Sequence, residues 1–372
     1  MKAWPLLGVL IVQTLLCLAH WFLYCTWIDF WWPMSPTATV ALRVVLATLS
    51  VSFMVAALLG FRFTNWLVAL VYQLAAAWLG LLNFLFVGAC LAWLADLPLR
   101  LAPGNLHLRL RPYEAAILLA AAVLTALYGL LNARQIRLRK VTVRLKNLPA
   151  AWHGRRAVVM SDLHLGNING VRFARRIADM VHSLQPDIIF LPGDLYDGTK
   201  ADAEALAEPL FQLTPPLGVY FVSGNHEEFG GASHYSDALR RRGFHVLDNA
   251  QVEIDGVLVL GVPYRDTSYP VRLQHFLVNQ GLENGKVSIL LQHVPNRLPM
   301  VEQSGVSLQL SGHTHGGQVF PFSWITRRAF GKFTYGLHPF GDLQVYTSSG
   351  AGTWGPPMRV GTHPEIVLLT FE

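Results

Sequence analysis

Four long apolar segments in the first third of the chain constrain its fold more than any other feature. They cover residues 6–24, 38–59, 66–95 and 115–131. A helix needs about 20 apolar residues to cross the hydrocarbon core of a bilayer, and the segments are near that length or longer. Tryptophans lie near several segment ends, as interfacial anchors do. We therefore predict a transmembrane anchor of about four helices within residues 1–133.

The composition divides the chain at the end of these segments. Of 372 residues 52% are hydrophobic and only 14% are charged, and the apolar excess is concentrated in the first third. The remainder, residues 137–372, has the composition of a globular domain and is long enough for a core of its own. We predict that it is a separate soluble domain.

The positive charge of the chain carries little information about partners. A net charge of +6 is compatible with nucleic-acid binding, but the basic residues cluster beside the apolar segments or scatter over predicted helices. We expect no nucleic-acid partner. The three cysteines (Cys17, Cys25 and Cys90) lie in or next to the apolar segments, so a metal in the soluble domain must be held by His, Asp, Glu or Asn.

The same basic residues bear on the side of the membrane. With four spans, eight Lys and Arg residues fall on the side of the two termini and three on the other side. The positive-inside rule then favours a cytoplasmic soluble domain. Residues 137–148 alternate as the first strand of that domain would, so several of these charges also fit a solvated strand face.

Apolar strand-like runs alternate with helical patterns through the soluble domain. We predict strands at 157–161, 187–191, 218–222, 286–291 and 306–311, with helices between them. Further short strands are predicted at 244–262 and in the tail. Such alternation is typical of a layered α/β domain, and the strand-rich middle and tail favour two packed sheets.

Five of the strand-like runs end in a short polar motif. In chain order the motifs are D-x-H, G-D, G-N-H, a single H, and G-H-x-H. In open α/β sheets the carboxyl ends of the strands are where ligands bind. The side chains delivered there are Asp162, His164, Asp194, Asn225, His226, His293, His313 and His315.

These residue types favour one kind of chemistry. Carboxylates, an amide oxygen and imidazoles suit Mn²⁺, Fe²⁺ or Zn²⁺ rather than a pure calcium or copper site. Two ions about 3.5–4 Å apart that share one carboxylate can polarise a phosphoryl group and provide a bridging hydroxide as the nucleophile. The motifs therefore predict two divalent metal ions and hydrolysis of a phosphate ester or anhydride.

The ordered motifs resemble those of the calcineurin-like binuclear metallophosphoesterase superfamily, whose soluble domain is an αββα sandwich. The sequences G-H-T-H-G-G-Q and S-S-G-A-G-T-W-G-P-P-M-R resemble its membrane-associated bacterial branch, related to enzymes that cleave UDP-2,3-diacylglucosamine. The resemblance covers residues 137 to the end. It implies one metal held by Asp162, His164 and His315, and a second held by Asn225, His293 and His313. It further implies that Asp194 bridges the metals and that His226 is a catalytic residue facing the substrate.

Several functions remain compatible with the sequence. The anchor favours a lipid-linked phosphodiester or pyrophosphate such as UDP-2,3-diacylglucosamine, with membrane lipid as a partner. One alternative is a phosphodiesterase or phosphatase with broad specificity for soluble nucleotides. Another, from a different class, is a membrane transport or sensor protein that uses the domain to bind a phosphoryl ligand. Charged residues lining the helices or an incomplete ligand set would favour that third function.

Two further groups of residues have open roles. Arg359 could pair with a substrate phosphate or form a structural ion pair. Arg327, Arg328 and Lys332 lie among aromatic residues in a stretch that we predict to be a loop. That loop could lie at the membrane surface or cap a substrate cleft.

Overall fold

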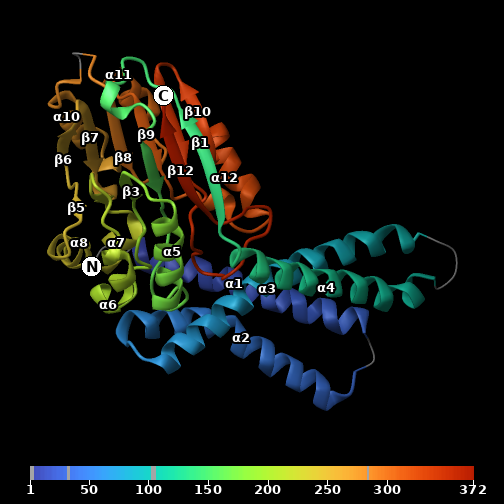
Figure 1. Cartoon of the computed structure of the whole chain (residues 1–372). Coiled ribbons are helices and arrows are strands. Elements are labelled where there is room, and N and C mark those ends of the chain that lie inside the picture. The colour runs from blue at the N-terminus through green and yellow to red at the C-terminus, as the bar shows by residue number, and fades with distance from the viewer. Residues whose placement is uncertain (1–3, 32–33, 102–105, 283–284) are drawn as a thin grey trace. The chain divides into compact units, whose positions relative to one another are not determined.

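The computed structural model describes residues 4–31, 34–101, 106–282 and 285–372 (Figure 1). The chain divides into two compact units. The first comprises residues 1–131 together with 355–358. The second comprises residues 132–354 together with 359–372. The two units are described separately below.

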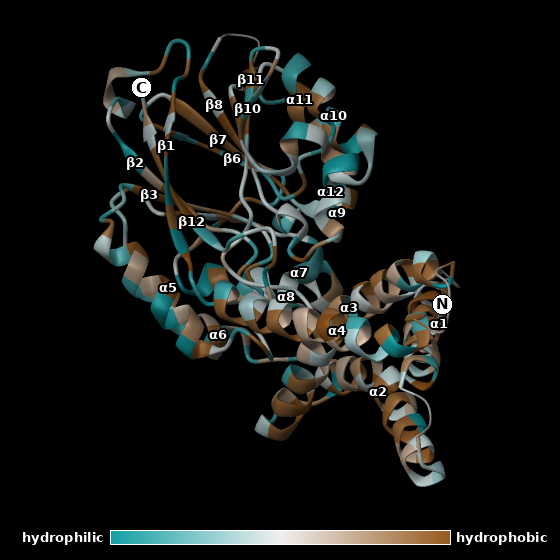
Figure 2. Cartoon of the chain, turned by 90° about the vertical axis from the view of Figure 1, so that its right-hand side faces the viewer, coloured by the Kyte–Doolittle hydropathy of each residue, from teal (hydrophilic) through white to brown (hydrophobic). Residues whose placement is uncertain are grey.

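Four long helices form most of the first unit. They are α1 (Trp4–Phe30), α2 (Pro36–Arg62), α3 (Trp66–Leu99) and α4 (Leu106–Ala133). By length and composition, all four could cross a membrane, and Figure 2 shows that apolar residues predominate along them. Ser35 and Asn65 cap α2 and α3, since each side chain accepts a main-chain N–H of the first turn.

The helices are longer than the apolar segments of the sequence and therefore contain charged residues. Asp29, Asp96 and Arg111 all lie inside helices, and Arg111 forms ion pairs with both carboxylates. The Arg111 Nε atom is 3.1 Å from Asp96 Oδ1, and both side chains are buried. Arg100, just after α3, also pairs with Asp96, at 2.7 Å. Ion pairs of this kind offset part of the desolvation cost of burying charged side chains.

The second unit contains two six-stranded sheets. The first has the order β1-β12-β2-β3-β4-β5 and the second the order β10-β11-β9-β8-β7-β6. The strands of the first sheet are β1 (Arg137–Val143), β2 (Arg156–Val159), β3 (Ile188–Pro192), β4 (Val219–Val222), β5 (His245–Val246) and β12 (Glu365–Phe371). Those of the second are β6 (Ala250–Ile254), β7 (Val257–Val262), β8 (Ser288–Gln292), β9 (Leu308–Ser311), β10 (Gly336–Phe340) and β11 (Leu343–Thr347).

Helices cover the outer faces of both sheets. In the central strand β3, Ile188 and Phe190 belong to the core between the sheets, while Ile189 and Leu191 belong to the core under the helices. Alternation of this kind follows from the two-residue period of a strand. The helices over the first sheet are α5 (Val171–Ser183), α6 (Ala203–Ala207) and α8 (Ala232–Arg241), and those over the second are α10 (Pro270–Val278) and α11 (Leu298–Gln303). The predicted two-sheet α/β domain after four apolar helices is confirmed.

Four of the α-helices and strands that the structure describes were not predicted from the sequence. They are α7 (Asn225–Gly230), α9 (Tyr264–Thr267), α12 (Phe322–Phe330) and β10. The prediction of a loop around Arg327 and Arg328 is wrong, because both residues lie in α12. None of the nine residues of α12 is buried, so its sequence lacks the inward-facing apolar pattern by which a helix is recognised.

Candidate metal centre

All eight predicted site residues follow the carboxyl ends of five parallel strands. Asp162 and His164 follow β2, Asp194 follows β3, and Asn225 and His226 begin α7 directly after β4. In the other sheet His293 follows β8, while His313 and His315 follow β9. Strands β2, β3 and β4 are parallel neighbours, as are β8 and β9. Parallel neighbours end at one edge of their sheet, which is why motifs far apart in sequence meet.

Five of these residues have a backbone conformation that side chains rarely adopt. The φ angles lie between 48° and 71° for Asp162, His164, Asp194, His313 and His315. A residue other than glycine in this left-handed region costs of order 1–3 kcal/mol and persists only where the surroundings hold it. Strain concentrated at one place in this way is typical of functional sites.

We call the cluster of the eight predicted site residues the cage. Two glycines allow the main chain to approach it closely. At Gly224 a Cβ atom would lie 2.1 Å from Asp194 Oδ1. At Gly193 it would lie 2.6 Å from His293 Nδ1, and the φ angle there is +93°. Any side chain at either position would displace a predicted ligand, so both turns require glycine.

Asp162, His164 and His315 form the first group of potential ligands. The Nε2 atoms of the two imidazoles are 3.0 Å apart, and His315 Nε2 is 3.5 Å from Asp162 Oδ1. Burial lowers the pKa of both histidines well below the usual value, and the charges of neighbouring histidines and of Arg359 lower it further. Both imidazoles are therefore neutral near pH 7 and have a nitrogen lone pair to offer a cation.

The second group contains Asn225, His293 and His313, with Asp194 beside them. His293 Nδ1 donates to the Pro192 carbonyl at 2.8 Å, which leaves Nε2 facing Asp194 Oδ2 at 3.1 Å. A lone pair facing a carboxylate oxygen repels it unless a proton or a cation lies between them. Burial lowers the pKa of His293, but the charge of Asp194 outweighs it and raises the value to about 9. The structure thus favours positive charge at this point.

Asp194 lies between the two groups. Its Oδ2 atom is 3.8 Å from His164 Nε2 and 3.1 Å from His293 Nε2, and its Oδ1 atom accepts the main-chain N–H of His226 at 2.9 Å. Burial tends to raise the pKa of Asp194, but His293 and the other imidazoles lower it far below the usual value. The carboxylate is therefore ionised and shared by both groups.

The charges of the cage fit divalent cations. Asp162, Asp194 and Glu227 are three buried carboxyl groups within one small volume. Burial, opposed by His293 and reinforced by the negative charge of Asp194, raises the pKa of Asp162 to about 6. Carboxyl groups so far from water need compensating positive charge to ionise. Among the residues that the structure describes, three groups of three His or Asp side chains have ligand atoms within 4.8 Å of one another: Asp162–His164–His315, His164–Asp194–His226 and Asp194–His293–His313.

Glu227 holds the turn around Asp194, a role that the sequence did not indicate. Its carboxyl oxygens accept the main-chain N–H groups of Asp194 at 3.0 Å, Tyr196 at 2.9 Å and Gly224 at 2.7 Å. Burial, with the nearby charge of Asp194, raises the pKa of Glu227 to about 8. An acidic residue in the first turn of a helix is usually a solvent-exposed capping residue. The position of Glu227 in the sequence therefore did not indicate this buried role.

Arg359 holds the main chain around His315 in place. Its guanidinium donates to the carbonyls of His315, Gly350 and Gly352 and contacts His315 Nδ1 at 3.3 Å. The side chain is completely buried, so it does not present its charge to a substrate. Of the two roles left open by the sequence, the structural one fits these contacts, although its partners are carbonyls rather than a carboxylate.

His226 lies against the first group of potential ligands, with its ring centroid 4.6 Å from that of His164, and is only 6% exposed. Its Nδ1 atom donates to the Asp197 carbonyl at 2.8 Å, which leaves Nε2 for a second partner. Its ring centroid is 5.4 Å from that of Phe229 and 5.5 Å from that of Trp354. These aromatic side chains are 64% and 54% exposed. The imidazole of His226 is therefore bordered by two exposed apolar side chains.

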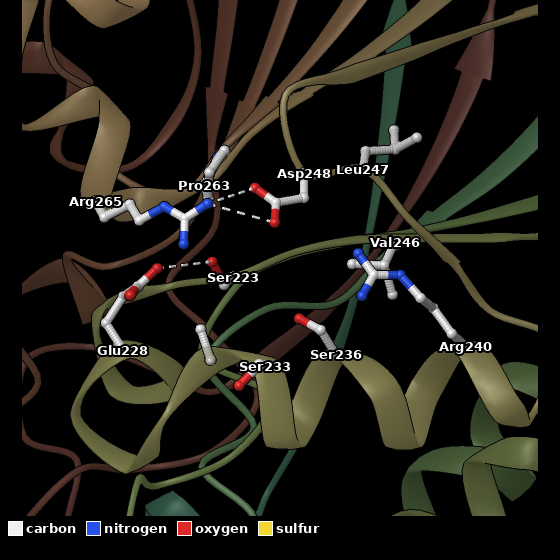
Figure 3. A pocket seen from close by; sticks show the side chains of 11 residues that line it. Ser223, Glu228, Ser233, Ser236, Arg240, Val246, Leu247, Asp248, Pro263 and Arg265 are labelled. Carbon is white, nitrogen blue, oxygen red and sulfur yellow. Dashed lines mark hydrogen bonds and ion pairs between the residues drawn. The ribbon is translucent and has the colours of Figure 1, made fainter.

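A small pocket next to the cage contains none of the predicted ligands. Its volume is about 80 Å³, and its lining includes Ser223, two residues before Asn225 (Figure 3). Arg265 pairs with Asp248 at 3.1 Å across it, and Ser223 donates to Glu228 at 3.3 Å. Both arginines that line it already have a carboxylate partner, Asp248 for Arg265 and Asp237 for Arg240, so we assign it no ligand.

Comparison with known proteins identifies the same part of the chain. A family model described as calcineurin-like phosphoesterase matches residues 155–317. A "transmembrane protein with metallophosphoesterase domain" of the zebrafish Danio rerio is 31% identical over 328 residues, covering 83% of this chain and 74% of the relative. Its counterpart of the same name in Bos taurus is 31% identical over 303 residues, 76% of this chain and 67% of the relative.

A bacterial relative is similar over a shorter stretch. An "uncharacterized metallophosphoesterase" of Aquifex aeolicus is 34% identical over 258 residues, which is 68% of this chain and 97% of the relative. The zebrafish match covers more of this chain than residues 137–372 make up, so the similarity to that protein extends into the N-terminal helices.

Proposed function

The chain belongs to the calcineurin-like phosphoesterase family and is a metal-dependent phosphoesterase, and on that premise we propose that it is a membrane-anchored two-metal phosphohydrolase. Its proposed substrate is a lipid-linked phosphodiester or pyrophosphate. The observation that carries this proposal is the position of Asp194, one carboxylate shared by two groups of imidazoles next to His226.

We assign the metal-binding roles as follows. Asp162, His164 and His315 would hold one ion, Asn225, His293 and His313 the other, and Asp194 both. The contact of 2.9 Å between His313 Nδ1 and Asn225 Oδ1 supports placing these two residues in one group. Bound divalent ions would lower the pKa of a water molecule and polarise the phosphoryl oxygens. Mn²⁺, Fe²⁺ and Zn²⁺ all suit this donor set.

His226 is proposed as the catalytic residue. With Nδ1 bonded to the Asp197 carbonyl, only Nε2 remains to hold a proton toward the substrate. From there it would donate that proton to the leaving oxygen or stabilise the negative charge that develops in the transition state. Its main-chain N–H bond to Asp194 fixes the start of α7 relative to the shared carboxylate.

The surround of His226 supports a substrate with an apolar part. Phe229 and Trp354 are large, exposed and in ring contact with the imidazole. Four helices long and apolar enough to cross a membrane would keep such a domain near lipid substrates. UDP-2,3-diacylglucosamine combines a pyrophosphate with two acyl chains and is our leading candidate. The excess of basic residues on the side of the termini supports a cytoplasmic domain.

Hydrolysis by the detergent-purified full chain with added Mn²⁺ tests this proposal. Wild type and Asp194→Asn would be compared on UDP-2,3-diacylglucosamine and on an aryl phosphodiester. We expect metal-dependent cleavage of the lipid that Asp194→Asn abolishes. Cleavage of the aryl ester alone would keep the metal chemistry, reject the lipid substrate and favour a phosphoesterase for soluble nucleotides. No cleavage of either, with metal bound, would favour a transport or sensor protein that only binds the phosphoryl group.

A further inference from the structure

Helix α12 is joined directly to the proposed ligand turn. A Cβ atom at Gly317, two residues after His315, would lie 2.3 Å from Ser323 Cα, so the first turn of the helix packs on the main chain of the turn. At its other end the Phe330 ring centroid is 6.2 Å from that of His313. The Thr314 hydroxyl donates to the Thr334 carbonyl at 2.7 Å, just beyond the helix. The helix is therefore held at both ends beside the cage.

Most of the large apolar side chains of α12 are exposed, whereas a surface helix of a soluble protein usually buries them. The half-buried positions are 323, 326 and 330, spaced three and four residues apart, and two of them are Ser323 and Thr326. The exposed positions include Trp324, at 66% exposure, and Ile325, at 62%. A surface helix in water normally turns its apolar stripe inward. In α12 Phe322, Trp324 and Ile325 are exposed, whereas Phe330 is half-buried beside His313.

The same exposed surface carries positive charge without a counterion. Arg327 and Arg328 are both exposed and form no ion pair with any residue that the structure describes. By contrast, Arg241 and Arg242, at the end of α8, both pair with Glu204. The outer face of α12 thus combines Phe322, Trp324 and Ile325 with two unpaired guanidinium groups.

We propose that this outer face of α12 binds the surface of an anionic lipid bilayer. Trp, Phe and Ile side chains insert at the boundary between headgroups and acyl chains, while Arg guanidinium groups bind lipid phosphates. A symmetric contact between two copies of α12 would instead bring four unpaired guanidinium groups together, which is unfavourable. Bilayer docking at α12 would hold the cage at the lipid surface. Only this last consequence rests on the proposed function.

Hydrogen exchange of the full wild-type chain tests the docking without any substitution. The chain would be placed in nanodiscs of phosphatidylcholine alone and of phosphatidylcholine with phosphatidylglycerol. We expect amide exchange in residues 322–330 to slow in the anionic discs, while exchange in α10, another helix with exposed apolar side chains, stays the same. Equal exchange of residues 322–330 in both discs would overturn the proposal.

A fluorescent probe gives a second and independent measurement. The native cysteines would be replaced by alanine, and an environment-sensitive fluorophore attached to Ile325→Cys or, as the matched control, to Val271→Cys on α10. In anionic discs we expect a blue-shifted emission at position 325 only, and a smaller shift when Arg327→Ser and Arg328→Ser are added. Equal emission at both positions would overturn the proposal. A blue shift at position 325 that disappears when the chain is diluted within the lipid would also overturn it, because the probe would then be covered by a second copy of the chain.

These measurements separate the docking surface from the proposed function. A shielded probe without hydrolysis of UDP-2,3-diacylglucosamine would reject the substrate and keep the docking surface. Hydrolysis of that lipid with a water-exposed probe at position 325 would keep the substrate and reject the docking surface. Metal content, measured for every variant, would show that the cage beside α12 is intact.

Discussion

Glu227 accepts the main-chain N–H of Asp194 with its Oε2 atom at 3.0 Å. The shared carboxylate of the cage is thus positioned by a second carboxyl group that is itself completely buried. The bond links the start of α7 to the turn after β3, and therefore links the residues proposed to hold both metals. The cage depends on this inner contact as well as on the ligands themselves.

Replacing Glu227 should weaken metal binding although the residue is not a proposed ligand. Glu227→Ala leaves three main-chain N–H groups without an acceptor, and each unsatisfied buried group costs about 1–3 kcal/mol. We expect the melting temperature to fall by several degrees and the bound metal to decrease. Thermal unfolding and elemental analysis measure both. Glu228→Ala, one residue further along α7, is the control, and an equal loss in the two variants would contradict the assigned role.

Removing His226 should slow catalysis without releasing metal. A general acid contributes roughly 10²–10⁴-fold to the rate, so His226→Ala should lower kcat by about that factor while metal content stays at the wild-type level. Steady-state kinetics on an aryl phosphodiester and elemental analysis provide the comparison. His234→Ala, an exposed histidine of α8, should leave both unchanged. Loss of metal in His226→Ala would show that the residue is a ligand instead.

The exposed aromatic residues around His226 should contribute to binding of a lipid-linked substrate. Burying a large apolar side chain is worth about 1.5–3 kcal/mol. We therefore expect Phe229→Ser combined with Trp354→Ser to lower kcat/KM on the lipid substrate by roughly 10-fold or more. A phosphoester without an apolar group should be affected much less. Tyr269→Ser, at an exposed aromatic residue that contacts none of the proposed ligands, is the control. An equal decrease on both substrates would contradict this assignment.

Arg359 should be needed for the structure of the cage rather than for substrate binding. Arg359→Lys keeps a positive charge but loses the planar group that donates to three carbonyls. We expect a lower melting temperature and less bound metal, with KM unchanged for the fraction that retains metal. Arg172→Lys, at an exposed position on α5, is the control. A higher KM with full metal content would instead indicate contact with the substrate phosphate.

Much of this architecture could be predicted because each proposed ligand follows an apolar strand. The strands before Asp162, Asp194 and Asn225 all read as buried β-type runs, and the parallel arrangement of such strands brings their carboxyl ends together. That the eight residues meet in one place agrees with the sequence prediction. Their individual roles as ligands stay predictions.

Other contacts could not be predicted, because they depend on packing between distant segments. Glu227 reads as an ordinary acidic residue in a first helical turn, and only its burial reveals its three acceptor contacts. Arg359 lies 44 residues beyond His315, with no pattern to connect them. None of the residues of α12 is buried. Its sequence therefore lacks the apolar spacing by which a surface helix is recognised, and we predicted a loop there.

The most direct test of the central claim is the metal content and activity of the purified full chain during chelation and reconstitution. We predict about two divalent ions per wild-type chain, loss of hydrolysis when a chelator removes them, and recovery when Mn²⁺ is restored. Asp194→Asn should bind fewer ions and stay inactive, while Asp179→Asn, on the exposed side of α5, should behave as wild type. Hydrolysis that survives complete removal of the metal, or an Asp194→Asn variant with full metal content and activity, would contradict a two-metal centre built around Asp194.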